Sequence, residues 1–219
     1  MVLSKTIKRY WLPVLVHVGA LLPLALLIRD YSQDAFIIDP VKEITTRTAR
    51  AALVLLFLSL ACSPVNTLFG FRQALRVRRA LGLYAFMYAG LHFLTFIGLD
   101  YAFEFSLIGP AIIDQRFVLV GFAAFLLLIS LAITSTRGWQ RRLRKNWKRL
   151  HRFVYLAAIL VVVHFLWAVK DAREPLRYAA VLAVLLAFRL PWVRRAAGRV
   201  RHRLRLGRFL VPLKAIVGQ

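Results

Sequence analysis

Long uncharged, apolar runs alternate with short charged segments along the 219 residues of the chain. A helix crosses the hydrocarbon core of a bilayer, about 30 Å thick, with roughly 20 apolar residues. Five runs approach or reach that length, and a sixth is interrupted only by Arg189, close enough to its end to extend to the membrane surface. The expected spans cover about residues 10–28, 51–71, 80–99, 117–136, 153–169 and 178–193. The pattern predicts an all-α, polytopic six-helix transmembrane bundle over residues 1–195, followed by a basic cytoplasmic tail over 196–219.

Charged side chains are segregated between alternate connections of these spans. The segment before the first span, the connections after the second and fourth, and the segment after the sixth are rich in Lys and Arg and contain no acid. All nine Asp and Glu residues fall in the remaining connections. Because Lys and Arg are retained on the cytoplasmic side during insertion, both the N-terminus and the C-terminus are expected to be cytoplasmic.

The net charge of +23 also raises nucleic-acid binding as an interpretation. A nucleic-acid-binding domain would not normally hold such long uncharged runs, and the basic segments adjoin every second membrane boundary. Insertion and attraction to anionic headgroups explain that placement. We therefore expect membrane lipid, and no nucleic acid, beside the basic segments.

One apolar segment, residues 105–113, is too short to span a membrane. Gly109 and Pro110 interrupt it. Two interpretations stay open: an interfacial cap or docking surface at the outer face, or a plain connecting loop.

Histidines are the candidate chemistry of the spans. His202 lies in the basic tail and is expected to face solvent or headgroups. Four others fall in or at the ends of spans: His17, His92, His151 and His164. A lone intramembrane histidine is usually satisfied by an interhelical hydrogen bond. Several together favour a cofactor.

Depth relates two of these histidines. His92 lies 13 residues beyond Arg79, and His164 lies 12 residues beyond Arg152. At about 1.5 Å per residue, the two rings are about 19.5 and 18 Å above the same boundary, on parallel helices. Matching depth is what two axial ligands of one iron require, and haem suits an apolar slot between helices. We expect His92 and His164 to share a haem in the outer half of the membrane.

His151 lies 13 residues before His164, about 19.5 Å lower, which suits a second redox centre near the inner surface. Thirteen residues turn an ideal helix so that the two rings lie roughly 140° apart. The matching depth on the third span holds Arg78 and Arg79 rather than histidine. A second haem would need another ligand, with His17 or water as candidates.

Several segments resemble the MsrQ (YedZ) family of the ferric-reductase-like transmembrane group. The resemblance extends to about residue 195 and rests on "HVGALLP", "DPVKEITTRTAR", "RRALGLYAFMYAGLHFLTF" and "TSTRGWQRRLRKNWKRLHRFVYL". It implies a multi-pass haem b subunit of the bacterial inner membrane, with His92, His151 and His164 as haem-iron ligands. It also implies transfer of electrons to MsrP, a periplasmic molybdopterin methionine sulfoxide reductase that repairs oxidised periplasmic proteins.

The resemblance associates quinol with the electron supply, and also FMN and a cytosolic flavin reductase. The missing lower histidine on the third span leaves one or two haems possible. The chain contains no Gly-rich dinucleotide motif, so reducing equivalents are expected from a separate molecule and the chain is expected to be a redox subunit rather than the catalytic one. The expected electron donor site is the basic inner face around His151, and the expected docking surface comprises residues 30–47 and 101–115.

Two other functions remain as alternatives. A stand-alone transmembrane haem oxidase or ferric reductase would release electrons to a small acceptor. A transporter with a histidine proton relay is less favoured, because no span contains the Asp or Glu that usually accompanies such a relay.

Overall fold

The described part of the chain is helical. The computed structural model describes residues 2–193, 195–196 and 198–199, and within them there is no strand. The elements are α1 (Val2–Ser32), α2 (Pro40–Phe69), α3 (Gln73–Thr95), the π-helical turn η1 (Phe96–Asp100), α4 (Phe105–Asp114), α5 (Arg116–Ile133), α6 (Arg137–Leu150), α7 (Phe153–Ala168) and α8 (Arg173–Ala187). His202 and most of the basic tail lie outside the described residues.

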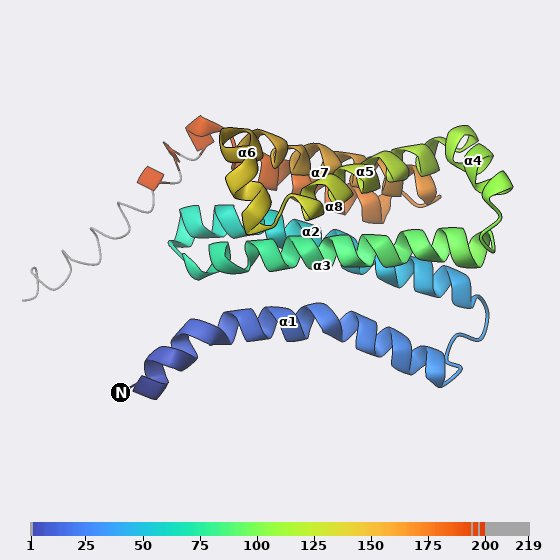
Figure 1. Ribbon diagram of the computed structural model, residues 1–219, viewed down its shortest axis with the longest axis horizontal. Helices are drawn as coiled ribbons and strands as arrows, with labels where there is room; N and C mark the ends of the chain where they lie inside the picture. Colours follow the sequence, from blue (N-terminus) through green and yellow to red (C-terminus); the bar gives the residue numbers. More distant parts are fainter. Residues whose placement is uncertain (1, 194, 197, 200–219) are drawn as a thin grey trace, which may run out of the picture.

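The axes of the long helices are roughly aligned with one another, and the connections between the helices gather at two ends (Figure 1). The α1–α2 connection and α4 lie at one end, which we call the acidic end because residues 30–43 and 100–114 carry most of the carboxylates. The N-terminal part of α1, the α2–α3 turn and α6 lie at the other, basic end. α3 packs mainly on α2, and α7 mainly on α5.

Multi-pass membrane insertion is supported, whereas the count of six spans is not confirmed. Four described helices are long and apolar enough to cross a membrane: Tyr10–Ser32, Pro40–Phe69, Gln73–Asp100 and Arg116–Ile133. A fifth span results if α6 and α7, which meet at an angle of 52°, are taken together. The cytoplasmic position of the termini stays a prediction.

The continuous sixth span expected over 178–193 is not found. α8 covers Arg173–Ala187, and a turn at residues 188–190 separates it from the next helical residues. Its 15 residues are about 22 Å long, less than a bilayer core. The turn directs Arg189 inward rather than to the membrane surface: its guanidinium donates to the Leu60 carbonyl at 2.8 Å and lies 5.1 Å from the centre of the Tyr155 ring.

The segment 105–113, expected as a cap or a loop, is part of the helix α4 and packs on α5. Its Ile108 and Ala111 are buried, whereas Phe105 and Ile113 are exposed. A helix with one buried face and one exposed apolar face favours the interfacial cap over the irregular loop.

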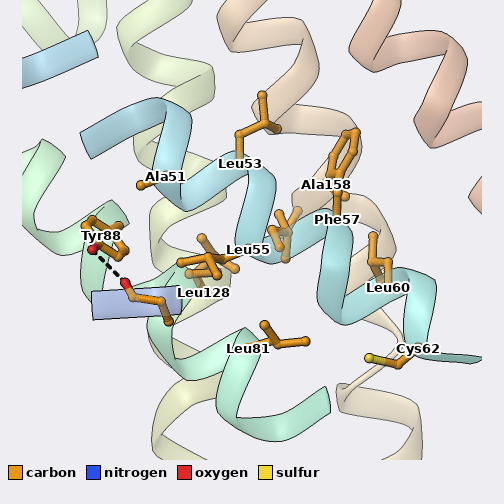
Figure 2. Close-up of a cluster of buried hydrophobic side chains, with 14 of the residues drawn as sticks. Ala51, Leu53, Leu55, Phe57, Leu60, Cys62, Leu81, Tyr88, Leu128 and Ala158 are labelled. Atoms are coloured by element: carbon orange, nitrogen blue, oxygen red, sulfur yellow. Dashed lines mark hydrogen bonds between the residues drawn. The ribbon is translucent and has the colours of Figure 1, made fainter. Parts of the chain in front are cut away.

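α2 is the centre of the bundle and contacts α1, α3, α7 and α8. Asp39 caps its first turn by accepting a hydrogen bond from the Lys42 N–H, and Gly70 ends it with a left-handed φ of 72°. The buried side chains around it come from several helices (Figure 2) and include Leu53, Leu55, Phe57, Leu60, Leu81, Leu128, Ala157 and Ala158. The small Ala157 and Ala158 let α7 approach closely, as small residues do at membrane helix interfaces.

Tyr88 joins α3 to α1 within this core. Its hydroxyl donates to the Ala20 carbonyl at 2.7 Å, the bond dashed in Figure 2, and accepts from the Leu24 N–H at 3.0 Å. It therefore stands between two groups that would bond each other in an unbroken helix. Pro23 lies inside α1 at the same turn and provides no N–H of its own. The hydroxyl therefore satisfies backbone groups where proline weakens the helix.

Candidate metal centre

His92 of α3 and His164 of α7 lie face to edge near the acidic ends of their helices. Their ring centres are 6.2 Å apart and the rings are inclined by 75°. The two rings come from the two different helix pairs, α2–α3 and α5–α7. The structure thus brings together His92 and His164, the two residues that the count of helical residues placed at the same depth.

Each of these rings is held through its Nδ1 atom. His92 Nδ1 lies 3.1 Å from the Thr45 carbonyl oxygen, and His164 Nδ1 lies 2.7 Å from that of Phe117. A carbonyl oxygen can only accept, so both Nδ1 atoms are assigned the proton and both Nε2 atoms keep their lone pairs. A histidine whose Nδ1–H bonds a backbone carbonyl is in the tautomer that binds a metal through Nε2.

Gly121 of α5 makes room for the His164 ring. A Cβ atom at this position would lie 2.6 Å from His164 Nδ1 and 2.7 Å from Cε1, distances that real contacts essentially never show. The glycine therefore lets the ring lie against the backbone of α5, where it reaches the Phe117 carbonyl. Sequence reasoning missed Thr45, Phe117 and Gly121, because a carbonyl partner and a missing side chain leave no mark on a residue pattern.

The pair fits a haem better than a bare metal ion. Among the described residues, no group of three or more His, Cys, Asp or Glu side chains could hold a metal ion. Haem needs only axial ligands from the protein, because its macrocycle supplies the others. His92 and His164, with ring centres 6.2 Å apart, would supply the two imidazole nitrogens that such a group takes from the protein.

Two further features border the histidine pair. The hydroxyl of Thr45 is buried and has no hydrogen-bond partner within the described part of the chain. A recess of about 360 Å³ is lined by Arg116, Phe117 and Trp167, and so adjoins the residue that holds His164. The orphaned hydroxyl is a buried polar group that a bound group could satisfy, whereas the recess lies within the α5–α7 pair.

His151 lies at the basic end, where α6 meets α7. Its ring stacks on Trp147 at 4.1 Å between centres, and its Nε2 lies 3.2 Å from the Thr134 hydroxyl. Trp147 in turn donates its indole N–H to the Thr134 carbonyl at 2.9 Å. His151 therefore belongs to an aromatic and polar cluster that ties α6 to the end of α5.

His17, the candidate partner of His151, instead lies on the α1–α3 interface. Its Nδ1 is 2.8 Å from the hydroxyl of Tyr84. Of the four predicted histidines, the structure pairs only His92 with His164 within its described residues. A role of His151 or His17 in binding haem stays a prediction.

Known proteins resemble this chain over most of its length. The family model described as "Ferric reductase like transmembrane component" matches residues 46–162. A relative from Xanthomonas euvesicatoria pv. vesicatoria, named "Protein-methionine-sulfoxide reductase heme-binding subunit MsrQ", is 46% identical over 196 residues, which cover 86% of this chain and 89% of the relative. The chain belongs to the MsrQ family.

A second MsrQ relative of the same name, from Rhodospirillum rubrum, is 44% identical over 185 residues, covering 83% of this chain and 89% of the relative. No solved structure matches the chain. The similarity to MsrQ proteins confirms the resemblance that the sequence segments indicated. The matched model for the ferric-reductase-like group includes His92 and His151 and ends two residues before His164.

Proposed function

We propose that this MsrQ-family chain is the haem b-binding membrane subunit of a bacterial methionine sulfoxide reductase system. The observation that carries the proposal is the His92–His164 pair, with both Nδ1 atoms bonded to backbone carbonyls. The names of its relatives, which describe heme-binding subunits of a methionine sulfoxide reductase, support it. When bound, the haem would supply one-electron redox chemistry inside the membrane.

The protein residues in this proposal bind and orient. His92 and His164 would bind the iron through Nε2, while Thr45 and Phe117 fix the tautomer and direction of the rings through their carbonyl oxygens. Gly121 opens the place that the His164 ring occupies. Apolar helices exclude water and lower the local dielectric around the site.

For orientation, we propose that the basic end faces the cytoplasm and the acidic end the periplasm, in the bacterial inner membrane. Residues 1–195 then form the electron-transfer domain and 196–219 a basic cytoplasmic tail. The histidine pair lies nearer the periplasmic end, since it is close to the ends of α3 and α7 that face away from the basic end.

The acidic end offers a surface for a periplasmic partner. Ile37 is 90% exposed and Ile38 97% exposed in the α1–α2 connection, and Phe105 and Ile113 are exposed on α4. Exposed apolar side chains beside acidic ones are typical of protein interaction sites. We propose that MsrP, the periplasmic molybdopterin subunit, docks there through residues 30–47 and 101–115.

Electron uptake is proposed at the basic end. The donor would be the quinol pool or a cytosolic flavin reductase, with FMN as a further candidate cofactor. The His151–Trp147–Thr134 cluster lies between α6 and the bundle, so it is well placed to couple a donor at this face to the interior. His151 remains a candidate ligand of a second haem there.

Stopped-flow measurement of the two half-reactions tests both ends. We expect His151→Ala to slow reduction of the haem by the donor and to leave its reoxidation by MsrP unchanged. Ile38→Ser should slow only reoxidation, while Phe69→Ser, which changes a side chain 78% exposed at the basic end, serves as the matched control. Wild-type reduction in His151→Ala would contradict uptake at that end, and fast reoxidation by oxygen or ferric iron without MsrP would favour a stand-alone oxidase or ferric reductase.

A further inference from the structure

One polar pair faces the lipid side of the bundle and has no role in the function proposed above. His17 of α1 and Tyr84 of α3 are joined by a 2.8 Å hydrogen bond, and their rings meet edge to face with centres 5.6 Å apart. His17 is exposed and Tyr84 is half-buried. The residues Val14, Leu15 and Val18, which lie near His17 on α1, are also exposed, at 58 to 60%, as expected of lipid-facing side chains.

The pair lies below the headgroup region. His17 is eight residues beyond Arg9 and Tyr84 is five residues beyond Arg79, which places them about 12 and 7.5 Å from the basic boundary. Phospholipid headgroups and esters are concentrated at the interface, so they are poor partners at this depth. An exposed polar group facing hydrocarbon is costly unless something satisfies it.

The hydrogen bond leaves one ring nitrogen available. Since His17 uses Nδ1 for Tyr84, its Nε2, which has no hydrogen-bond partner among the described residues, can accept or donate a further hydrogen bond, according to tautomer. The Tyr84 hydroxyl can act as both donor and acceptor. Together they match a neutral, lipid-soluble molecule that carries a hydroxyl or carbonyl group on an aromatic or quinonoid ring.

We infer that His17 and Tyr84 bind the head group of a hydroquinone or its quinone at the lipid-facing surface between α1 and α3. The inference rests on the proposed function, in which a donor supplies electrons from the basic half of the membrane. Tyr84 lies on the same helix as His92, eight residues before it, so the site is about 12 Å along α3 from the histidine pair. The two sites are thus connected by one helix.

Binding of decylubiquinone to the purified full-length protein in lipid nanodiscs tests this site. The readouts are saturable quenching of tryptophan fluorescence and the infrared carbonyl stretch of ¹³C-labelled quinone, which a hydrogen bond lowers. We expect the wild type to show both. Tyr84→Phe and His17→Leu should each weaken binding roughly 2- to 13-fold, the range for loss of a single hydrogen bond, and should remove much of the carbonyl shift.

Tyr31→Phe is the matched control, because this tyrosine is 61% exposed on the same α1 helix near its acidic end. It should leave both signals unchanged. The haem absorption spectrum, recorded on every variant, separates a lost quinone site from a failed fold and from failure of the proposed function. Absence of saturable binding in the wild type, or wild-type binding and carbonyl shift in Tyr84→Phe, would overturn the inference. Loss of haem from His17→Leu with Tyr84→Phe still binding quinone normally would overturn it too, and would assign His17 to the haem.

Discussion

Gly121→Ala tests whether the His164 ring needs the space beside α5. The new Cβ would lie 2.6 Å from His164 Nδ1, whereas ordinary van der Waals contact begins at about 3.4 Å, so the ring must shift by most of an ångström. That movement lengthens the 2.7 Å hydrogen bond to the Phe117 carbonyl and turns Nε2 away from its direction. The perturbation acts on the orientation of the ring without removing the ring.

The size of the effect follows from these contacts. A lost hydrogen bond costs about 0.5–1.5 kcal/mol, and overpacking of a well-packed site costs about 1–3 kcal/mol. Changes to groups that orient a metal ligand typically weaken metal binding about 10- to 100-fold. We expect Gly121→Ala to release haem 10- to 100-fold faster to an apomyoglobin acceptor, and to weaken the low-spin absorption bands.

Gly90→Ala provides the control for this experiment. Gly90 lies on α3, two residues before His92, and a Cβ atom there would meet nothing within 4 Å. Its haem release and spectrum should match the wild type. Wild-type haem release from Gly121→Ala would refute the argument that this glycine is required for the position of His164.

Three further predictions concern the bundle itself. Tyr88→Phe removes the hydroxyl between α3 and α1 and should lower the free energy of unfolding by about 1 kcal/mol, whereas the control Tyr31→Phe should not. Equal melting temperatures of Tyr88→Phe and the wild type would contradict this prediction. Arg144 has φ 45° and ψ −116° at the kink of α6, a conformation that favours glycine, so Arg144→Gly should raise stability by up to about 1 kcal/mol, and a clear loss would contradict it. The side chains of the Arg50–Glu174 ion pair are 54% and 43% exposed, so a double-mutant cycle should give a coupling energy below about 1 kcal/mol. A coupling energy above about 2 kcal/mol would contradict this prediction.

Sequence patterns predicted the helical membrane fold well where the apolar runs are long. The runs 51–71 and 117–136 fall largely within α2 and α5, because about 20 uncharged residues can hardly be anything but a span. α2 nevertheless begins at Pro40, since Asp39 and Pro40 form a helix start that hydrophobicity does not register. Charge patterns alone also hid α6, whose basic residues suggested a connection although it forms a helix with Trp147 directed at the bundle.

The end of the chain and the details of the site were harder to predict. Arg189 was expected to reach the membrane surface, but the turn after α8 lets it bond the Leu60 carbonyl instead. Depth arithmetic related His92 to His164 because both helices are regular and parallel over that distance. It could not find Thr45, whose contribution is a backbone carbonyl.

The proposed function depends on His92 and His164 binding the same haem iron. The most direct measurement is the low-spin haem signal, by visible absorption and electron paramagnetic resonance, of His92→Ala, His164→Ala and the double variant, with His202→Ala as a control outside the described residues. If the two histidines are ligands of one iron, each single variant loses this signal as completely as the double variant does, and His202→Ala keeps it. A full low-spin signal in either single variant would contradict the account.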